Sequence, residues 1–342
     1  MITRIGHTLQ LSSPANILSY AAVGGKKEAE GPLGAYFDAV FDDTTLGAPS
    51  FEKAESALQS QALRLALQKA NLRAEALQMV LAGDLLNQCI SSTFAMRDLG
   101  LPFLGLYGAC STMALSLGLA CVLAACGAAT PVAAITSSHF ASAERQFRLP
   151  LEYGGQRPPT AQWTATAAGC VIITTQPKAL QIPHVCFGSI VDLGVHDAAN
   201  MGAAMAPAAA QTLSQYLRDT HTLPGDYDGI FTGDLGAVGS DLFTQLMHRE
   251  GFPMPANHHD CGLLLFDRDK QDVHAGGSGC GCSASVLCST ILPAMRQGSL
   301  KNILFLATGA LMSPTSSQQG ESIPGIAHLV HIIRTPPDPP GA

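Results

Sequence analysis

Charged residues are scarce in this chain. They make up 13% of its 342 residues, whereas hydrophobic residues make up 47%. Because an average globular chain carries about 25% charged residues, this composition predicts a large buried core and little free surface, as in a close dimer or a docked subunit. The net charge of -7 and the lack of a basic run argue against nucleic acid as a partner and against attachment to anionic lipid.

Export and cofactor signals are also missing. The first 20 residues contain no uninterrupted apolar core, so we predict no signal peptide. The ten cysteines are therefore expected to be reduced thiols, most of them small core residues. Cys280-Gly281-Cys282 is too tight for the usual zinc spacing, and no second pair of this kind accompanies it. We predict neither a metal nor a cofactor.

One uncharged run, Thr112 to Ile135, is 24 residues long and would be long enough to cross a bilayer. Gly127 and Pro131 divide it, however, as a helix end and a strand start would. We therefore predict a buried helix through about Ala125, followed by a strand from Val132 to Thr136, and no transmembrane helix. A helix that is hydrophobic on all sides is expected at the centre of a large soluble protein.

The remaining pattern alternates helices and strands, which indicates an α/β fold. Helices are predicted over residues 51–71, 203–218 and 241–249, and others begin after Cys110 and near Ser283. Strands are predicted over residues 79–82, 103–107, 132–136, 170–174, 229–232 and 303–307.

The two halves of the chain resemble each other. Leu81-Ala82-Gly83-Asp84-Leu85 matches Phe231-Thr232-Gly233-Asp234-Leu235, and Gly108-Ala109-Cys110-Ser111 matches Gly281-Cys282-Ser283. An internal duplication explains both matches, with one half over residues 1–175 and the other over residues 176–342. A site is then expected where equivalent helix starts converge at the C-terminal ends of the strands.

Cys110 lies where a strand-like run gives way to the uncharged helix. An acyl-transfer enzyme would place its nucleophile at such a position. The positive end of a helix lowers the pKa of a thiol, so the position predicts a stabilised thiolate.

These features resemble the thiolase and ketoacyl-synthase III fold, in which duplicated halves form α-β-α-β-α layers. The closing strand and loop of that fold match Ile303-Leu304-Phe305-Leu306-Ala307-Thr308-Gly309-Ala310. More specific stretches resemble the stage V sporulation protein AD family: residues 138–147 (SHFASAERQF), 150–160 (PLEYGGQRPPT), 276–283 (GGSGCGCS) and 318–324 (QQGESIP). The resemblance implies a dipicolinate-binding component of the spore dipicolinic acid transport system. It further implies a peripheral location on the spore inner membrane, membrane subunits of the channel as partners, and a homodimer.

The same resemblance argues against catalysis. Condensing enzymes of this fold pair the cysteine with a histidine and an asparagine, or with two histidines. Here Gly233-Asp234-Leu235-Gly236 follows the strand that should precede the histidine, and Gly279-Cys280-Gly281-Cys282-Ser283 offers no amide. His258 and His259 stand in a polar stretch where a loop role is favoured over a catalytic one. A condensing or acyl-transfer enzyme using Cys110, and a protein that only docks membrane subunits, remain as alternatives.

Dipicolinate is a flat pyridine with two carboxylates, bound either free or as its calcium chelate. Two facing helix starts could supply N–H groups to it. Arginines 145, 148 and 157 either contact the carboxylates or pair with Glu144 and Glu152, and His139 is either a pocket residue or a satisfied buried histidine. The expected ligand-binding residues are Cys110, Ser111, His139, Arg145, Arg157, Asp234, Cys280, Gly281, Cys282 and Ser283.

Overall fold

Ten main strands lie side by side in one mixed sheet, in the order β11-β10-β13-β14-β9-β2-β8-β6-β4-β5, in a computed structural model that describes residues 1–147 and 157–335. The strands are β1 (Ile2–Ile5), β2 (Thr8–Gly25), β3 (Ala39–Phe41), β4 (Met79–Gly83), β5 (Phe103–Gly105), β6 (Val132–Ser138), β7 (Trp163–Thr164), β8 (Ala167–Thr174), β9 (Leu180–Phe187), β10 (Gly229–Thr232), β11 (His258–Asp260), β12 (Gly277–Ser278), β13 (Asn302–Ala310) and β14 (Gly325–Arg334).

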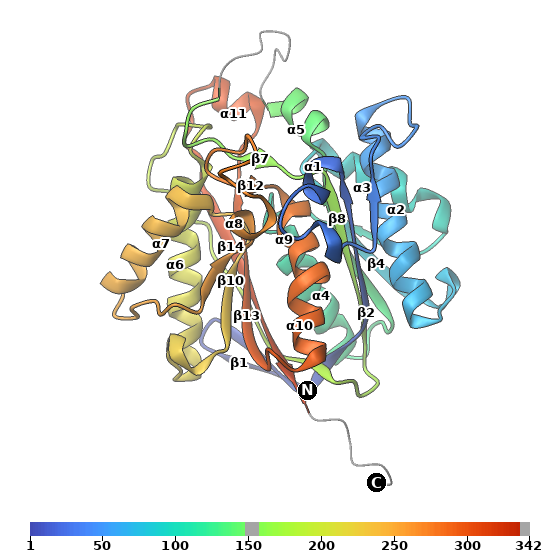
Figure 1. The fold of residues 1–342 in the computed structure, drawn as a ribbon. Coiled ribbons are helices and arrows are strands. Elements are labelled where there is room, and N and C mark those ends of the chain that lie inside the picture. The colour runs from blue at the N-terminus through green and yellow to red at the C-terminus, as the bar shows by residue number, and fades with distance from the viewer. Residues whose placement is uncertain (148–156, 336–342) are drawn as a thin grey trace.

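Helices lie on both sides of each half of this sheet, which gives five layers (Figure 1). α2 and α3 cover one outside face, α6 and α7 cover the other, and α4, α9 and α10 fill the space between the two halves. The helices are α1 (Lys26–Ala29), α2 (Phe51–Ala70), α3 (Ile90–Met96), α4 (Thr112–Ala125), α5 (Phe140–Phe147), α6 (Met201–Thr220), α7 (Gly236–Arg249), α8 (Cys261–Leu265), α9 (Cys280–Val286), α10 (Leu292–Gln297) and α11 (Pro314–Gln318).

The strand order repeats between the two halves. β5-β4-β6-β8-β2 and β11-β10-β13-β14-β9 each place the third, second, fourth, fifth and first main strand of their half side by side. This repetition is what an internal duplication produces. β8 ends at Thr174 and β9 begins at Leu180, so the boundary placed at residue 175 falls in the connection between the halves and stays a prediction.

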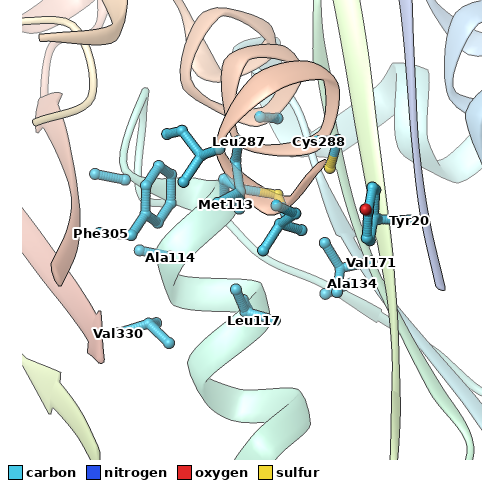
Figure 2. Packing of buried hydrophobic residues seen from close by; sticks show 14 of the residues in the cluster. Tyr20, Met113, Ala114, Leu117, Ala134, Val171, Leu287, Cys288, Phe305 and Val330 are labelled. Carbon is cyan, nitrogen blue, oxygen red and sulfur yellow. The ribbon is translucent and has the colours of Figure 1, made fainter. Parts of the chain in front are cut away.

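The core explains why α4 carries no charge. Met113, Ala114 and Leu117 are fully buried between Val171 on one sheet half and Phe305 on the other (Figure 2). Burying a leucine or methionine side chain stabilises the fold by about 1.5–3 kcal/mol, and a charge on the buried faces of α4 would be unpaired. No helix in the described residues is long and apolar enough to cross a membrane, which confirms the prediction for the uncharged run.

The predicted elements are present, but several boundaries differ. Phe103–Gly105 ends two residues early, because the chain then turns into the loop before Cys110. α7 begins at Gly236, five residues before the predicted start, because the carboxylate of Asp260 accepts hydrogen bonds from the N–H groups of Leu235 (2.9 Å) and Gly236 (3.0 Å). α9 begins at Cys280, not near Ser283. The long strands β2, β9 and β14 have no counterpart among the predicted elements.

Candidate functional site

Cys110 lies in a strained turn between β5 and α4. The preceding residue, Ala109, has a φ of 49°, a left-handed conformation that costs a non-glycine residue about 1–2 kcal/mol. Gly309, at the end of β13, passes so close that a Cβ there would lie 2.5 Å from the carbonyl oxygen of Gly108. This close approach brings the C-terminal half against the turn and leaves Cys110 only 5% exposed.

Ser278 is the residue that faces Cys110 from the other half. Its Oγ lies 3.9 Å from the Sγ of Cys110 and donates a 3.1 Å hydrogen bond to the carboxylate of Asp234. The same carboxylate accepts bonds from the N–H of Gly279 (2.9 Å) and from Oγ1 of Thr308 (2.8 Å). Asp234 therefore fixes Ser278 beside the thiol.

The electrostatics of this arrangement suppress the thiolate. Burial raises the pKa of Cys110 well above its usual value, and the neighbouring Asp234 raises it further. Burial likewise raises the pKa of the Asp234 carboxyl. The expectation of a helix-stabilised thiolate was therefore wrong, because desolvation and an adjacent carboxylate outweigh the field at the start of α4. Both effects favour the thiol form of Cys110 over its thiolate.

A narrow cleft of about 40 Å³ opens above Cys110. Its lining residues come from both halves and from α5: Leu85, Tyr107, Ala109, Cys110, Ala143, Glu144, Phe147, Thr164, Met201, Ser278, Ala310 and Met312. Most of this surface is apolar or aromatic, and its hydroxyl groups belong to Tyr107, Thr164 and Ser278. Lysine, arginine and histidine are absent from this lining, within the described part of the chain. The cleft is small compared with typical ligand pockets of about 300–1,000 Å³, so a ligand with a ring requires one wall to move.

α5 forms the wall that carries Ala143, Glu144 and Phe147. A buried carboxyl, Glu55 on α2, holds this helix by accepting a 2.7 Å hydrogen bond from Oγ of Ser142. Burial and the neighbouring Asp84 raise the pKa of Glu55 to about 8.

Comparison with known proteins decides the family. A family model described as stage V sporulation protein AD matches residues 6–333. The stage V sporulation protein AD of Bacillus subtilis (strain 168) is 46% identical over 317 residues, which cover 93% of this chain and 94% of that protein.

The chain belongs to the stage V sporulation protein AD family. The resemblance drawn from the sequence is thereby confirmed, and the chain is a sporulation protein by family.

Solved structures with this architecture include condensing enzymes. The 3-oxoacyl-[acyl-carrier-protein] synthase III of Aquifex aeolicus matches with a TM-score of 0.56 and 13% identity, over 94% of this chain and 100% of that one. Cerulenin-bound OleA of Xanthomonas campestris gives a TM-score of 0.60 and 13% identity, over 97% of this chain and 100% of that one. At these identities the likeness shows the fold, and the predicted thiolase-like α/β fold is confirmed.

Two of the expected ligand-binding residues, Cys110 and Asp234, lie at the cleft. Cys110 lines the cleft, and Asp234 lies directly behind Ser278. Ser111 is fully buried and donates its hydroxyl back to the carbonyl of Gly108, so it does not reach the lining.

The four residues of the second helix start, Cys280 to Ser283, are buried in α9 and are not among the lining residues. Sγ of Cys280 donates to the carbonyl of Ser137 (3.1 Å), and the N–H of Gly281 donates to Oγ of Ser138 (3.1 Å). Cys282 packs in the core between the halves. The sequence match paired Cys110 with Cys282, which is four residues too far along the chain. In the structure α4 begins two residues after Cys110 and α9 begins two residues after Ser278, so Ser278 is the equivalent of Cys110.

His139 is a satisfied buried histidine. Its Nε2 lies 2.7 Å from the carbonyl oxygen of Thr44, its Nδ1 accepts from the N–H of Ala141, and its ring stacks on Phe51. Because Nδ1 accepts, Nε2 carries the proton and the ring is neutral, in keeping with a pKa lowered by burial. It is not among the cleft residues.

The arginines also have protein partners. Arg145 forms an ion pair with Glu52 on α2. Arg157 lies over the ring of Trp163, 4.5 Å from its centre, and donates to the carbonyl of Asp272 (3.0 Å). Neither arginine is among the residues that line the cleft. The pairing of the arginines with Glu144 and Glu152 stays a prediction. Arg148 and Glu152 lie outside the described residues.

His258 and His259 were placed in a loop, but they form β11 with Asp260. His258 lies 3.1 Å from Oγ1 of Thr232, and His259 stacks on Phe231. Burial lowers the pKa of His258 to about 4. They stand at the outer edge of the sheet and not in the cleft.

Sequence reasoning missed Ser278, Thr308, Tyr107, Phe147 and Thr164 as site residues. The signal for Ser278 was present, because it lies in the glycine-rich stretch Gly276-Gly277-Ser278-Gly279. Glycines on both sides of one hydroxyl residue indicate a close approach of backbone to that position.

Proposed function

We propose that this chain is a non-enzymatic ligand-binding protein of sporulation, whose ligand is dipicolinic acid, and that it serves as the binding subunit of the spore dipicolinate channel. The observation that carries the proposal is the environment of Cys110: a buried thiol at the base of a cleft, with the hydroxyl of Ser278 and the carboxylate of Asp234 close by. The family membership supports a role in sporulation.

The site is poorly equipped for acyl transfer. A thiol attacks an acyl group as its thiolate, and Asp234 disfavours that form. The developing oxyanion needs N–H or other donors close by, each of which typically lowers the barrier by about 3 kcal/mol. Asp234 presents acceptor oxygens instead, and its charge would repel an oxyanion.

The cleft suits a flat aromatic ring better than a flexible acyl chain. Tyr107 and Phe147 offer aromatic surfaces, while Ser278 and Thr164 offer hydroxyl groups that can donate to carboxylates. The parallel pairing of β7 with β12 holds Thr164 directly beside Ser278. Because Glu144 also lies in the lining, a doubly charged ligand would have to bind with its carboxylates toward the hydroxyl side, or as its calcium chelate.

Calorimetric titration of dipicolinate into the purified protein tests this proposal. Cys110→Trp fills the base of the cleft and is expected to abolish saturable binding. Cys126→Trp is the matched control, because Cys126 follows the far end of the same helix and is exposed. No binding to the unchanged protein at millimolar ligand, or equal binding by both variants, would rule out this site.

The partners follow from the same proposal. We place the protein on the surface of the spore inner membrane, docked to membrane subunits of the channel, and we propose a homodimer formed through the edge strand β5. Leu104 on that strand is 42% exposed, and Phe94 and Tyr107 nearby are 39% and 44% exposed. Leu104→Lys should give a monomer in sedimentation analysis, whereas an unchanged mass would place the dimer contact elsewhere.

A second candidate function is acyl transfer by Cys110 in the manner of ketoacyl synthase III. The position of the cysteine at the start of the central helix favours it. Incubation with acyl-coenzyme A followed by intact-mass measurement would reveal an adduct that Cys110→Ala lacks. An adduct would overturn the non-enzymatic proposal, and its absence across chain lengths would remove this candidate.

A further inference from the structure

A chain of buried polar side chains ties α2 to the ends of β4 and β6. Oε1 of Glu55 on α2 accepts a 3.0 Å hydrogen bond from Oγ of Ser137, and that hydroxyl accepts one of 2.8 Å from Nε2 of Gln59. The same amide nitrogen donates to Oγ of Ser92, which in turn donates a 2.6 Å hydrogen bond to the carboxylate of Asp84. All five side chains are at most 1% exposed, so the chain joins two carboxyl groups away from solvent.

Glu55 reaches α5 through Ser142. Oγ of Ser142 lies 2.7 Å from Oε2 of Glu55 and 3.1 Å from the carbonyl oxygen of His139. A protonated Glu55 can donate from Oε2 to this hydroxyl, which then donates to the carbonyl of His139. An ionised Glu55 instead places a negative charge at a buried position near the carboxyl of Asp84, which is unfavourable. The closed arrangement of α5 therefore depends on the proton of Glu55.

α5 separates two hollows. On one side its residues line the cleft, and on the other side Ser142, Arg145 and Gln146 line a polar hollow of about 360 Å³ together with residues 86–88. Water in this hollow can approach Ser142, which is one hydrogen bond away from Glu55. The hollow also leaves room for α5 to move away from the cleft.

We propose that Glu55 is a proton-dependent latch on α5: with its proton, the carboxyl holds α5 against the cleft, and loss of the proton lets α5 move toward the polar hollow and opens the cleft. The latch supplies the wall movement that a ligand with a ring requires. Because it acts on α5 itself, it does not depend on which ligand enters.

Other titratable groups stand around this latch. Arg145 on α5 forms an ion pair with a second glutamate of α2, and the ring of His139 is neutral. Burial raises the pKa of the Asp84 carboxyl, so the protons of the two buried carboxyls come off as those of a pair. Glu144 lies on the cleft side of α5. Burial also raises the pKa of three thiols near the chain, which keeps them protonated: Cys89, Cys170 and Cys280.

The test is hydrogen–deuterium exchange of the ligand-free protein, read by mass spectrometry of peptides that contain α5. The pKa of Glu55 is about 8 in the closed form against an ordinary value of 4.5, so opening releases a proton. The opening equilibrium then rises by up to about tenfold per pH unit until about pH 8 and is flat above it. After correction for the intrinsic pH dependence of exchange, protection of α5 should fall more than about tenfold between about pH 6 and 8, while protection of α4 stays constant.

Glu55→Gln imitates the protonated carboxyl, because its amide nitrogen can donate to Ser142 and its oxygen can accept from Ser137. α5 should then stay protected at both pH values. Glu75→Gln, the same change at an exposed position, and Glu144→Gln on the cleft side should both behave like the unchanged protein. Where Glu55→Gln does not fold, Ser142→Ala carries the test: it removes the partner on α5 and should lower the protection of α5 already at the lower pH.

Protection of α5 that stays constant between the two pH values, or that falls equally in Glu55→Gln, would overturn the latch. Dipicolinate, which enters this cleft under the proposed function, should bind more tightly at the higher pH in the unchanged protein and equally at both in Glu55→Gln, because affinity scales with the open fraction. Exchange is measured without ligand, so a failure of dipicolinate to bind would remove the proposed function and leave the exchange result to decide the latch.

Discussion

Replacing Asp234 by asparagine should activate the Cys110 thiol. The carboxylate of Asp234 lies at most about 7 Å from the Sγ of Cys110, by way of Ser278, whose Oγ is 3.9 Å from the sulfur and 3.1 Å from the carboxylate. At an effective dielectric constant of about 20, two unit charges at about 7 Å interact by about 2.4 kcal/mol. Removing this repulsion should raise the thiolate fraction about 50-fold.

The substitution keeps the shape of the site. The asparagine oxygen can still accept from Ser278 and Gly279, and its amide nitrogen can donate to Oγ1 of Thr308, so the variant should fold. Alkylation of Cys110 by iodoacetamide between about pH 7 and 9, followed by peptide mass measurement, gives the rate of thiolate reaction. Asp241→Asn, an exposed residue on α7, is the control for a change of one charge.

Two results would refute this reasoning. Rapid alkylation of the unchanged protein at neutral pH would mean that the thiol is already activated. An Asp234→Asn rate equal to that of the Asp241→Asn control would mean that Asp234 does not hold the thiol in its protonated form.

Three further predictions concern the frame of the site. Glu55 has a pKa of about 8 in the folded protein, against an ordinary value of 4.5. The folded state therefore keeps a proton that the unfolded chain loses, and the free energy of unfolding falls as the pH rises from about 4.5 to 8. Glu55→Gln should remove a few kcal/mol of that fall, so the same pH dependence of urea unfolding in the variant and the unchanged protein would contradict this prediction. Gly281→Ala places a Cβ 2.3 Å from the backbone oxygen of Ala167 and should lower the free energy of unfolding by at least about 2 kcal/mol, whereas a loss below about 1 kcal/mol would show that α9 moves freely. His139→Ala should cost about 2–3 kcal/mol while dipicolinate affinity stays unchanged; a large loss of affinity would return His139 to the site.

The sequence predicted the parts of this molecule that depend on local pattern. The uncharged run of α4 could be assigned to a buried helix because Gly127 ended it, and the repeated Gly-Asp-Leu after β4 and β10 marked equivalent strands. β2, β9 and β14 were missed because they pair with strands far along the chain, and β9 carries Gln181, Pro183 and His184 among its apolar residues.

The site was harder to predict because its members meet across long distances in sequence. Cys110 and Ser278 are 168 residues apart, and neither segment contains a signal that the two residues face each other in the fold. A four-residue error in matching the helix starts made Cys282, instead of Ser278, the predicted equivalent of Cys110. The pKa of Cys110 depends on burial and on Asp234, neither of which a helix-start pattern reveals.

The position at which dipicolinate binds tests the proposed function most directly. Crystals of the protein soaked with dipicolinate should show difference density for one ring in the cleft between Cys110 and Ser278, with α5 displaced and the Cys110 sulfur unmodified. Density at another position, or an empty cleft in crystals whose soak exceeds the calorimetric dissociation constant, would contradict it.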